Sequence, residues 1–166
     1  MIGTATYCLY RGRQFTETWR GRDRVSGGEI VQIRRPDDVS SLEFPDAVAM
    51  GGEVGSFWVR LPRRKLSREW RETVYGTWKG VEFCLRRVTG RSTDALWGYT
   101  SDPQAGTLGI AGNQYDGWAG ELPADEVRLC YRMVFDYPLA IPYGDARLRG
   151  IPEVRTEFDA TAERES

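Results

Sequence analysis

Carboxylates are the side chains in this sequence that come closest to acid–base chemistry. Asp94, Asp102, Asp116 and Glu121 all fall in the second half of the chain, on or beside expected loops. Two such groups can divide the roles of acid and base in a hydrolase. Charged loop residues are also the ordinary covering of a soluble protein. A carboxylate-dependent hydrolase is therefore our third hypothesis, and we assign no catalytic residue.

The sequence lacks the residues that several other kinds of chemistry require. The sequence of 166 residues contains no histidine, which removes histidine triads and histidine metal sites. Cys8, Cys84 and Cys130 form an odd and widely spaced set, so we expect small buried residues and no disulfide framework or zinc site. The glycine-rich segment 106–112 lacks the spacing of a phosphate-binding loop, and we expect a flexible loop there. We predict no cofactor and no metal.

A basic run is the densest concentration of charge. Residues 60–71 carry six basic side chains and one acidic one. At its centre, Arg63, Arg64 and Lys65 are candidates for contacting a phosphate or an acidic partner. The alternative is a turn with solvated strand ends, whose charge complements Asp125 and Glu126 at the equivalent positions further along the chain. We favour this alternative and keep the three residues as partner-binding candidates.

The elements that must position these residues belong to an internal repeat. Five pairs of residues share an offset of 68 positions, and a second block with a tryptophan before Leu-Pro also occurs twice. A recurring pattern of this kind predicts one supersecondary unit used twice. The pairs are Tyr7/Tyr75, Tyr10/Trp78, Arg11/Lys79, Gly12/Gly80 and Phe15/Phe83, and the second block is Trp58-Val59-Arg60-Leu61-Pro62 and Trp118-Ala119-Gly120-Glu121-Leu122-Pro123.

The predicted fold class is all-β. Short runs of alternating or β-branched residues, separated by glycine and proline, indicate strands and turns. We expect a tandem repeat of two antiparallel β units of about 65 residues, small-barrel or roll-like and packed together. The first unit covers 4–71 and the second 72–135. Residues 136–166 form an irregular C-terminal extension whose end is expected to be mobile.

The aromatic residues divide into two groups. Those that recur in both copies are expected in the core, because the shared fold requires them. Those found in one copy only, Trp19, Trp97, Tyr99 and Tyr115, are candidates for contact. The acidic loop residues Asp102 and Asp116 join the candidates, since they can steer a basic partner. Together, the partner-binding candidates are Trp97, Tyr99, Asp102, Tyr115, Asp116, Arg63, Arg64 and Lys65.

Charge and hydropathy limit the classes of partner and the cellular compartment that we expect for this protein. The net charge is −1, so no global field favours nucleic acid, and we expect none to bind. Residues 1–71 nevertheless carry 13 basic and 9 acidic side chains, and residues 72–166 carry 10 and 15. No apolar stretch approaches the roughly 20 residues that cross a bilayer, and the N-terminus does not resemble a signal peptide. We expect a cytoplasmic protein without membrane contact.

Two resemblances follow from these motifs. The Trp58…Leu61-Pro62…Leu66 and Trp118…Leu122-Pro123…Val127 segments resemble the close of a Src-homology-3-like barrel. The duplicated Tyr10-Arg11-Gly12…Phe15 and Trp78-Lys79-Gly80…Phe83 units are similar to small bacterial repeat proteins, some of which are thought to be immunity proteins for polymorphic toxins. That resemblance implies a role in toxin inhibition and transfers no inhibitory residue.

Our leading hypothesis is a non-enzymatic protein-binding protein, most specifically an immunity protein that binds and blocks a cognate bacterial toxin. The alternative is a tandem small-barrel module that binds nucleic acid or another ligand through Arg63, Arg64, Lys65 and exposed aromatic residues. The sequence leaves the partner and the oligomeric state open.

Overall fold

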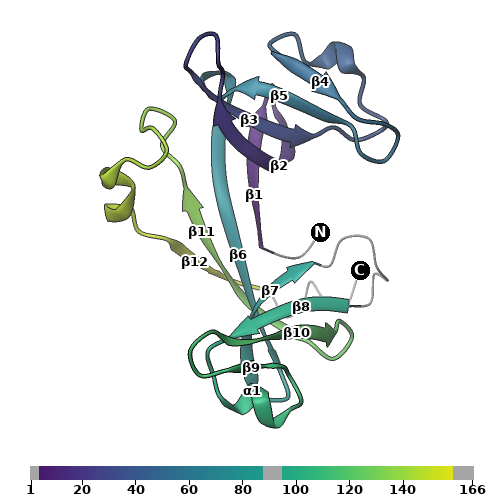
Figure 1. Ribbon diagram of the computed structural model, residues 1–166, viewed down its shortest axis with the longest axis vertical. Coiled ribbons are helices and arrows are strands. Elements are labelled where there is room, and N and C mark those ends of the chain that lie inside the picture. The colour runs from purple at the N-terminus through teal and green to yellow at the C-terminus, as the bar shows by residue number, and fades with distance from the viewer. Residues whose placement is uncertain (1–3, 88–94, 159–166) are drawn as a thin grey trace. The chain divides into compact units, whose positions relative to one another are not determined.

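The computed structural model describes residues 4–87 and 95–158 (Figure 1). Over these residues the chain is almost entirely β-structure, so the predicted all-β class is confirmed. Twelve described strands form one antiparallel sheet, which stays open and does not close into a barrel. Its main path runs β4-β5-β3-β2-β1-β6-β7-β8-β10-β9, and β11 pairs with β6 and β12. The strands are β1 (Ala5–Tyr10), β2 (Arg13–Arg22), β3 (Glu29–Arg34), β4 (Ala49–Gly51), β5 (Trp58–Pro62), β6 (Arg68–Trp78), β7 (Val81–Arg87), β8 (Ala95–Thr100), β9 (Gly112–Asn113), β10 (Gly117–Pro123), β11 (Arg128–Asp136) and β12 (Val154–Glu157).

The chain divides into two compact units. The N-terminal unit contains Ala5–Arg71 and Phe135–Pro152. The C-terminal unit contains, among the described residues, Thr4, residues 72–134 and the chain from Glu153 onward. Strands β6 and β11 each contribute residues to both units.

The region that we expected to be an irregular extension, 136–166, is divided between the units. Its first part belongs to the N-terminal unit and includes a 3-10 helix at Ala146–Gly150. Its second part supplies β12, which pairs with β11 in the C-terminal unit. The end that we expected to be mobile, 159–166, lies outside the described residues.

Two tight hairpins occupy the positions on which the repeat was proposed. Arg11 and Gly12 join β1 to β2 with φ values of 48° and 79°, and Lys79 and Gly80 join β6 to β7 with 49° and 79°. Two successive residues with positive φ define the turn whose twist matches antiparallel strands, and glycine suits its second position. The two turns are thus alike, whereas the tandem repeat as a whole stays a prediction.

The N-terminal unit has its own apolar core. Tyr10 and Phe15 are both buried, as predicted, and both rings pack against Phe44 at centroid distances of 5.8 and 5.3 Å. Burying each such side chain stabilises the fold by about 2 kcal/mol. The buried cluster comprises Cys8, Tyr10, Phe15, Val31, Ile33, Val39, Phe44, Val59, Leu61 and Leu66.

The C-terminal unit has a second core. Trp78 and Phe83 are buried in it, as predicted, and the indole N–H of Trp78 donates to Glu126 at 2.8 Å. Gly98 allows the close packing, because a Cβ there would lie 2.6 Å from a methyl group of Leu122. The buried cluster comprises Val74, Trp78, Val81, Phe83, Leu85, Ala105 and Leu122.

The expectation of a core position fails for one of the matched tryptophans. Trp118 is half-buried and packs against the core of the C-terminal unit. Trp58 is also half-buried, but it does not belong to the core of the N-terminal unit, and a guanidinium stacks on its ring. Among the described residues there is no helix long and apolar enough to cross a membrane.

Candidate functional site

The C-terminal unit presents aromatic residues on the face of its sheet that points away from the core. In the register, Tyr99 of β8 lies between Cys84 of β7 and Ala119 of β10, and Trp97 lies between Arg86 and Glu121. Side chains alternate across a strand, so these residues share one face, while neighbours such as Phe83 and Leu122 fill the core. Trp97 and Tyr99 are 41% and 47% exposed.

A shallow hollow of about 230 Å³ lies on this face. Its residues, Cys84, Arg86, Trp97, Tyr99 and Ala119, are called the aromatic face below. They offer an indole, a phenol, a guanidinium and the thiol of Cys84, and they include no carboxylate. The indole, the phenol and the guanidinium suit the burial of a partner's side chain.

The hairpin that carries Tyr115 and Asp116 adjoins the aromatic face. β9 pairs with β10 through Asn113 and Gly117, and Tyr115 at the tip is 87% exposed. Asn113 accepts from the backbone N–H groups of Tyr115 and Asp116 at 2.8 and 2.9 Å, which fixes the turn. Gly117 touches the ring of Tyr99, where a Cβ would come within 2.7 Å. The structure thus brings four candidates, Trp97, Tyr99, Tyr115 and Asp116, to one region.

The candidate carboxylates of this unit are engaged in their own turns. Asp102, which is half-buried, follows β8 and accepts from the backbone N–H of Gln104 at 2.9 Å, where the short helix α1 (Gln104–Thr107) begins. Asp116 accepts from the side-chain amide of Asn113 at 2.9 Å. Asp94 lies outside the described residues. Within the described ranges, no group of three or more cysteine, aspartate and glutamate residues is arranged to hold a metal ion.

Arg63 was wrongly predicted to contact a partner. Its side chain is 2% exposed and lies within the N-terminal unit. The guanidinium donates to Glu69 at 3.1 Å, to Glu29 at 3.0 Å, and to the backbone carbonyls of Pro138 and Ile141 at 3.1 and 2.6 Å. Residues 138–141 are thereby fastened to the unit by a buried cation.

The three basic side chains of this run point in different directions because Arg63–Lys65 forms one turn of 3-10 helix. With three residues per turn, successive side chains point about 120° apart. Arg63 therefore points inward, while Arg64 and Lys65 are exposed. Lys65 lies 3.5 Å from the carboxylate of Asp46. The nucleic-acid hypothesis that used all three cations therefore loses Arg63.

Further groups surround Arg63 in what we call the buried ion cluster, formed by Glu17, Arg20, Glu29, Arg63, Glu69 and Tyr143.

Within this cluster, Glu69 is fully buried and accepts from the hydroxyl of Tyr143. The backbone N–H of Tyr143 donates to Glu29 at 2.8 Å. Burial, followed by the hydrogen bond and charge of Glu69, raises the pKa of Glu17 to about 9. The proton that Glu17 retains reduces the repulsion between its carboxyl group and that of Glu69.

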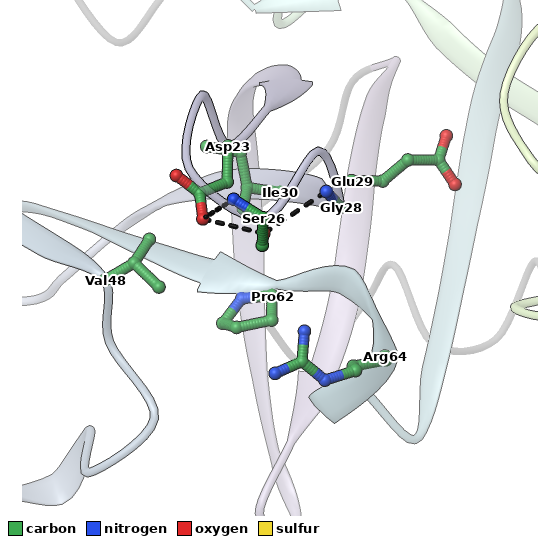
Figure 2. A pocket seen from close by; sticks show the side chains of 8 residues that line it. All are labelled: Asp23, Ser26, Gly28, Glu29, Ile30, Val48, Pro62 and Arg64. Carbon is green, nitrogen blue, oxygen red and sulfur yellow. Dashed lines mark hydrogen bonds between the residues drawn. The ribbon is translucent and has the colours of Figure 1, made fainter.

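Arg64 lines a small hollow beneath the turn between β2 and β3 (Figure 2). In Figure 2 its guanidinium lies beside Pro62, and Glu29 points away from the hollow. Asp23 is occupied by the turn, because it accepts from the hydroxyl of Ser26 at 2.7 Å. That bond is the main cause of the lowered pKa of Asp23. With a volume of about 100 Å³, the hollow has room for roughly three water molecules or one small side chain.

No family model, curated protein or solved structure matches this chain. Its function is therefore inferred from the surfaces described above. Of these surfaces, the aromatic face and its adjoining hairpin hold the largest number of the residues that the sequence singled out.

Proposed function

We propose that the protein is a non-enzymatic protein-binding protein, most specifically an immunity protein that binds and blocks a cognate bacterial toxin. The observation that carries this proposal is the aromatic face, where Trp97 and Tyr99 are each more than two-fifths exposed on a rigid sheet. Large aromatic side chains left in water on a paired sheet are unusual for a surface with no partner.

The composition of the aromatic face favours a protein as the partner. Tryptophan, tyrosine and arginine are the residue types that dominate the binding energy of protein interfaces. Trp97, Tyr99 and Arg86 supply all three types around one hollow. The exposed Tyr115 on the neighbouring hairpin extends the surface. A stable complex would bury about 1,600 Å² in total, so the partner must cover these loops as well as the face.

The charge of the C-terminal unit favours a basic partner. This unit carries 8 basic and 13 acidic side chains, a net charge of −5. Asp116 on the adjoining hairpin and Glu121 opposite Trp97 are exposed near the aromatic face. Such a field accelerates the association of a positively charged partner, and its effect declines as salt is added. Toxins that act on nucleic acid present basic surfaces of this kind, because they must bind phosphates.

The experiment is a binding and protection assay against any toxin domain that a neighbouring gene encodes. We expect the wild-type protein to co-purify with that domain and to protect cells that express it. Trp97→Ala and Tyr99→Ala should each weaken binding by about 2 kcal/mol, or about 30-fold.

Arg24→Ala is the matched control, because Arg24 is exposed, belongs to the other unit and is not among the partner-binding candidates. Its affinity should equal that of the wild type. A double variant, Trp97→Ala with Tyr99→Ala, that binds and protects as well as the wild type would exclude the aromatic face. Absence of any binding or protection would exclude the toxin-specific form of the proposal.

A further inference from the structure

A second surface lies on the N-terminal unit and uses none of the residues above. Trp19 of β2, Gln32 of β3 and Arg60 of β5 are successive partners across the sheet. Trp58 and Arg34 are also paired across β5 and β3, two positions away from Arg60 and Gln32, so they lie on the same face. Trp19, Arg34, Trp58 and Arg60 are called the indole platform below.

The arginine at the centre of the platform is held between the two indoles. The guanidinium carbon of Arg60 lies 4.7 Å from the ring centre of Trp19 and 5.1 Å from that of Trp58. Its Nε donates to the side-chain oxygen of Gln32 at 3.0 Å, and Gln32 in turn contacts the hydroxyl of Thr18 at 3.3 Å. The cation is therefore ordered before any ligand arrives, which lowers the entropic cost of binding.

Two glycines allow the indoles to lie over the backbone of the sheet. A Cβ at Gly21 would lie 2.1 Å from the ring of Trp19, and one at Gly51 would lie 2.5 Å from the ring of Trp58. Each ring thus covers a position where a side chain would otherwise stand. Trp19 is 43% exposed, and Trp58 is half-buried. Aromatic side chains displayed on an antiparallel sheet are surfaces on which planar rings can stack.

Positive charge accompanies these rings. Arg34 is exposed, and in the described part of the chain no carboxylate forms an ion pair with Arg34 or Arg60. The N-terminal unit as a whole carries 15 basic and 11 acidic side chains, a net charge of +4. A ligand that satisfies the platform must therefore combine planar rings with negative charge.

We propose that the indole platform binds single-stranded nucleic acid. Bases stack on Trp19 and Trp58, and the phosphates contact Arg34 and Arg60. An acidic peptide matches the charge but supplies no planar ring for the two indoles, and a duplex keeps its bases stacked on one another. The proposal is independent of the toxin-binding one, because the two surfaces lie in different units and share no residue.

The probes are fluorescein-labelled octamers of deoxythymidine and of uridine, titrated with the full chain and followed by fluorescence anisotropy. A short probe limits repulsion from the acidic C-terminal unit. We expect a dissociation constant on the order of 10⁻⁵ M in 50 mM salt. Two phosphate contacts predict a slope of about −1.4 in the plot of log affinity against log salt, which is about sevenfold weaker binding in 200 mM salt.

Variants separate stacking from charge. Trp19→Ala should weaken binding by about 5- to 150-fold, and Trp19→Phe should retain most of the affinity because a ring remains. Arg34→Gln should reduce the salt slope by about 0.7. Arg24→Gln removes the same charge from an exposed site of the same unit and is the matched control, with unchanged affinity. Circular dichroism of each variant confirms that the fold is retained.

Several results would overturn the proposal. One is the absence of any anisotropy change with either octamer at low salt. Another is equal loss of affinity in Arg34→Gln and Arg24→Gln, which would indicate attraction to the unit's net charge and no defined site. A third is equally tight binding of an octamer of glutamate, because the indoles would then contribute nothing.

Discussion

Replacing Arg63 by methionine should cost the N-terminal unit about 3–5 kcal/mol of unfolding free energy. The substitution keeps a long apolar side chain but leaves Glu69, which is 0% exposed, without its nearest cation. The carbonyls of Pro138 and Ile141 also lose their donors, at about 1–3 kcal/mol for each that stays buried. If residues 138–141 are released into water, water can hydrate their carbonyls and the loss of unfolding free energy is smaller. The range of about 3–5 kcal/mol is therefore an upper estimate for the whole cluster.

Hydrogen exchange followed by mass spectrometry measures this loss, because it reports on each unit separately. The backbone N–H of Tyr143 donates to Glu29 and is the most direct reporter of the fastened segment. A loss of 3 kcal/mol corresponds to exchange that is faster by about 150-fold. Arg64→Met is the control, since Arg64 is the exposed neighbour of Arg63 and its replacement should change stability by less than about 0.5 kcal/mol.

A double variant tests the electrostatic part of this reasoning. If the cost comes from an uncompensated buried charge, then Arg63→Met combined with Glu69→Gln should be more stable than Arg63→Met alone. Exchange at Tyr143 that is unchanged in Arg63→Met, together with unchanged stability, would refute the conclusion that this arginine fastens the segment.

Two further predictions concern buried titratable groups. Glu17 has an ordinary pKa of 4.5 and a folded pKa of about 9, so the folded protein binds more protons between these values, and its stability should fall as pH rises from 5 to 9. The fall in stability cannot exceed about 1.4 kcal/mol per pH unit, and Glu17→Gln should make it smaller. The measurement is the urea midpoint at pH 5 and at pH 8. A difference between the two midpoints that is the same in the wild type and in the variant would contradict the raised pKa of Glu17. Burial is the main cause of the raised pKa of the Cys8 thiol. Alkylation at pH 8 should therefore modify Cys130 of the native protein before Cys8, and urea should remove the difference, whereas rapid native modification of Cys8 would show that the core opens.

Local patterns in the sequence were sufficient to predict the class of fold. The alternating residues around Gly12 and Gly80 indicate strands, and the structure has strands there, joined by hairpin turns with positive φ values at both glycines. Tyr10 and Phe83 lie in the cores because bulky residues at alternate positions share one face of a strand. These predictions hold because neighbouring residues determine them.

Contacts between distant residues were not predictable in the same way. The run around Arg63 suggests a solvated patch, because nothing near it in the sequence reveals that Glu29 and the carbonyl of Ile141 surround it. The 3-10 turn that separates Arg63 from Arg64 also gives no local signal beyond the preceding proline. A buried cation is stabilised by its partners, and here they come from three separate parts of the chain.

The indole platform shows a second reason why a prediction from the sequence was wrong. Trp58 was expected in the core because Trp118 occupies the matching position, yet a cation stacks on its ring. Gly51, which leaves room for that ring, is 7 residues away and looks like an ordinary turn glycine in the sequence. Our expectation against nucleic acid rested on the whole-chain charge of −1, although the two parts of the sequence already showed the imbalance that the units carry, +4 and −5.

The chain supplies residues to the C-terminal unit before the N-terminal unit is complete, and this order has a consequence for folding during synthesis. The N-terminal unit takes its last residues from Phe135–Pro152, after the chain has already supplied 72–134 to the other unit. A ribosome that has produced only the first 71 residues has therefore not yet made the carbonyls and the tyrosine that complete the surroundings of Arg63. The first half of the gene, cloned alone, should yield a polypeptide in which Arg63 keeps Glu29 and Glu69 but lacks the carbonyls of Pro138 and Ile141. Recombination at its midpoint cannot exchange one unit without damaging the other.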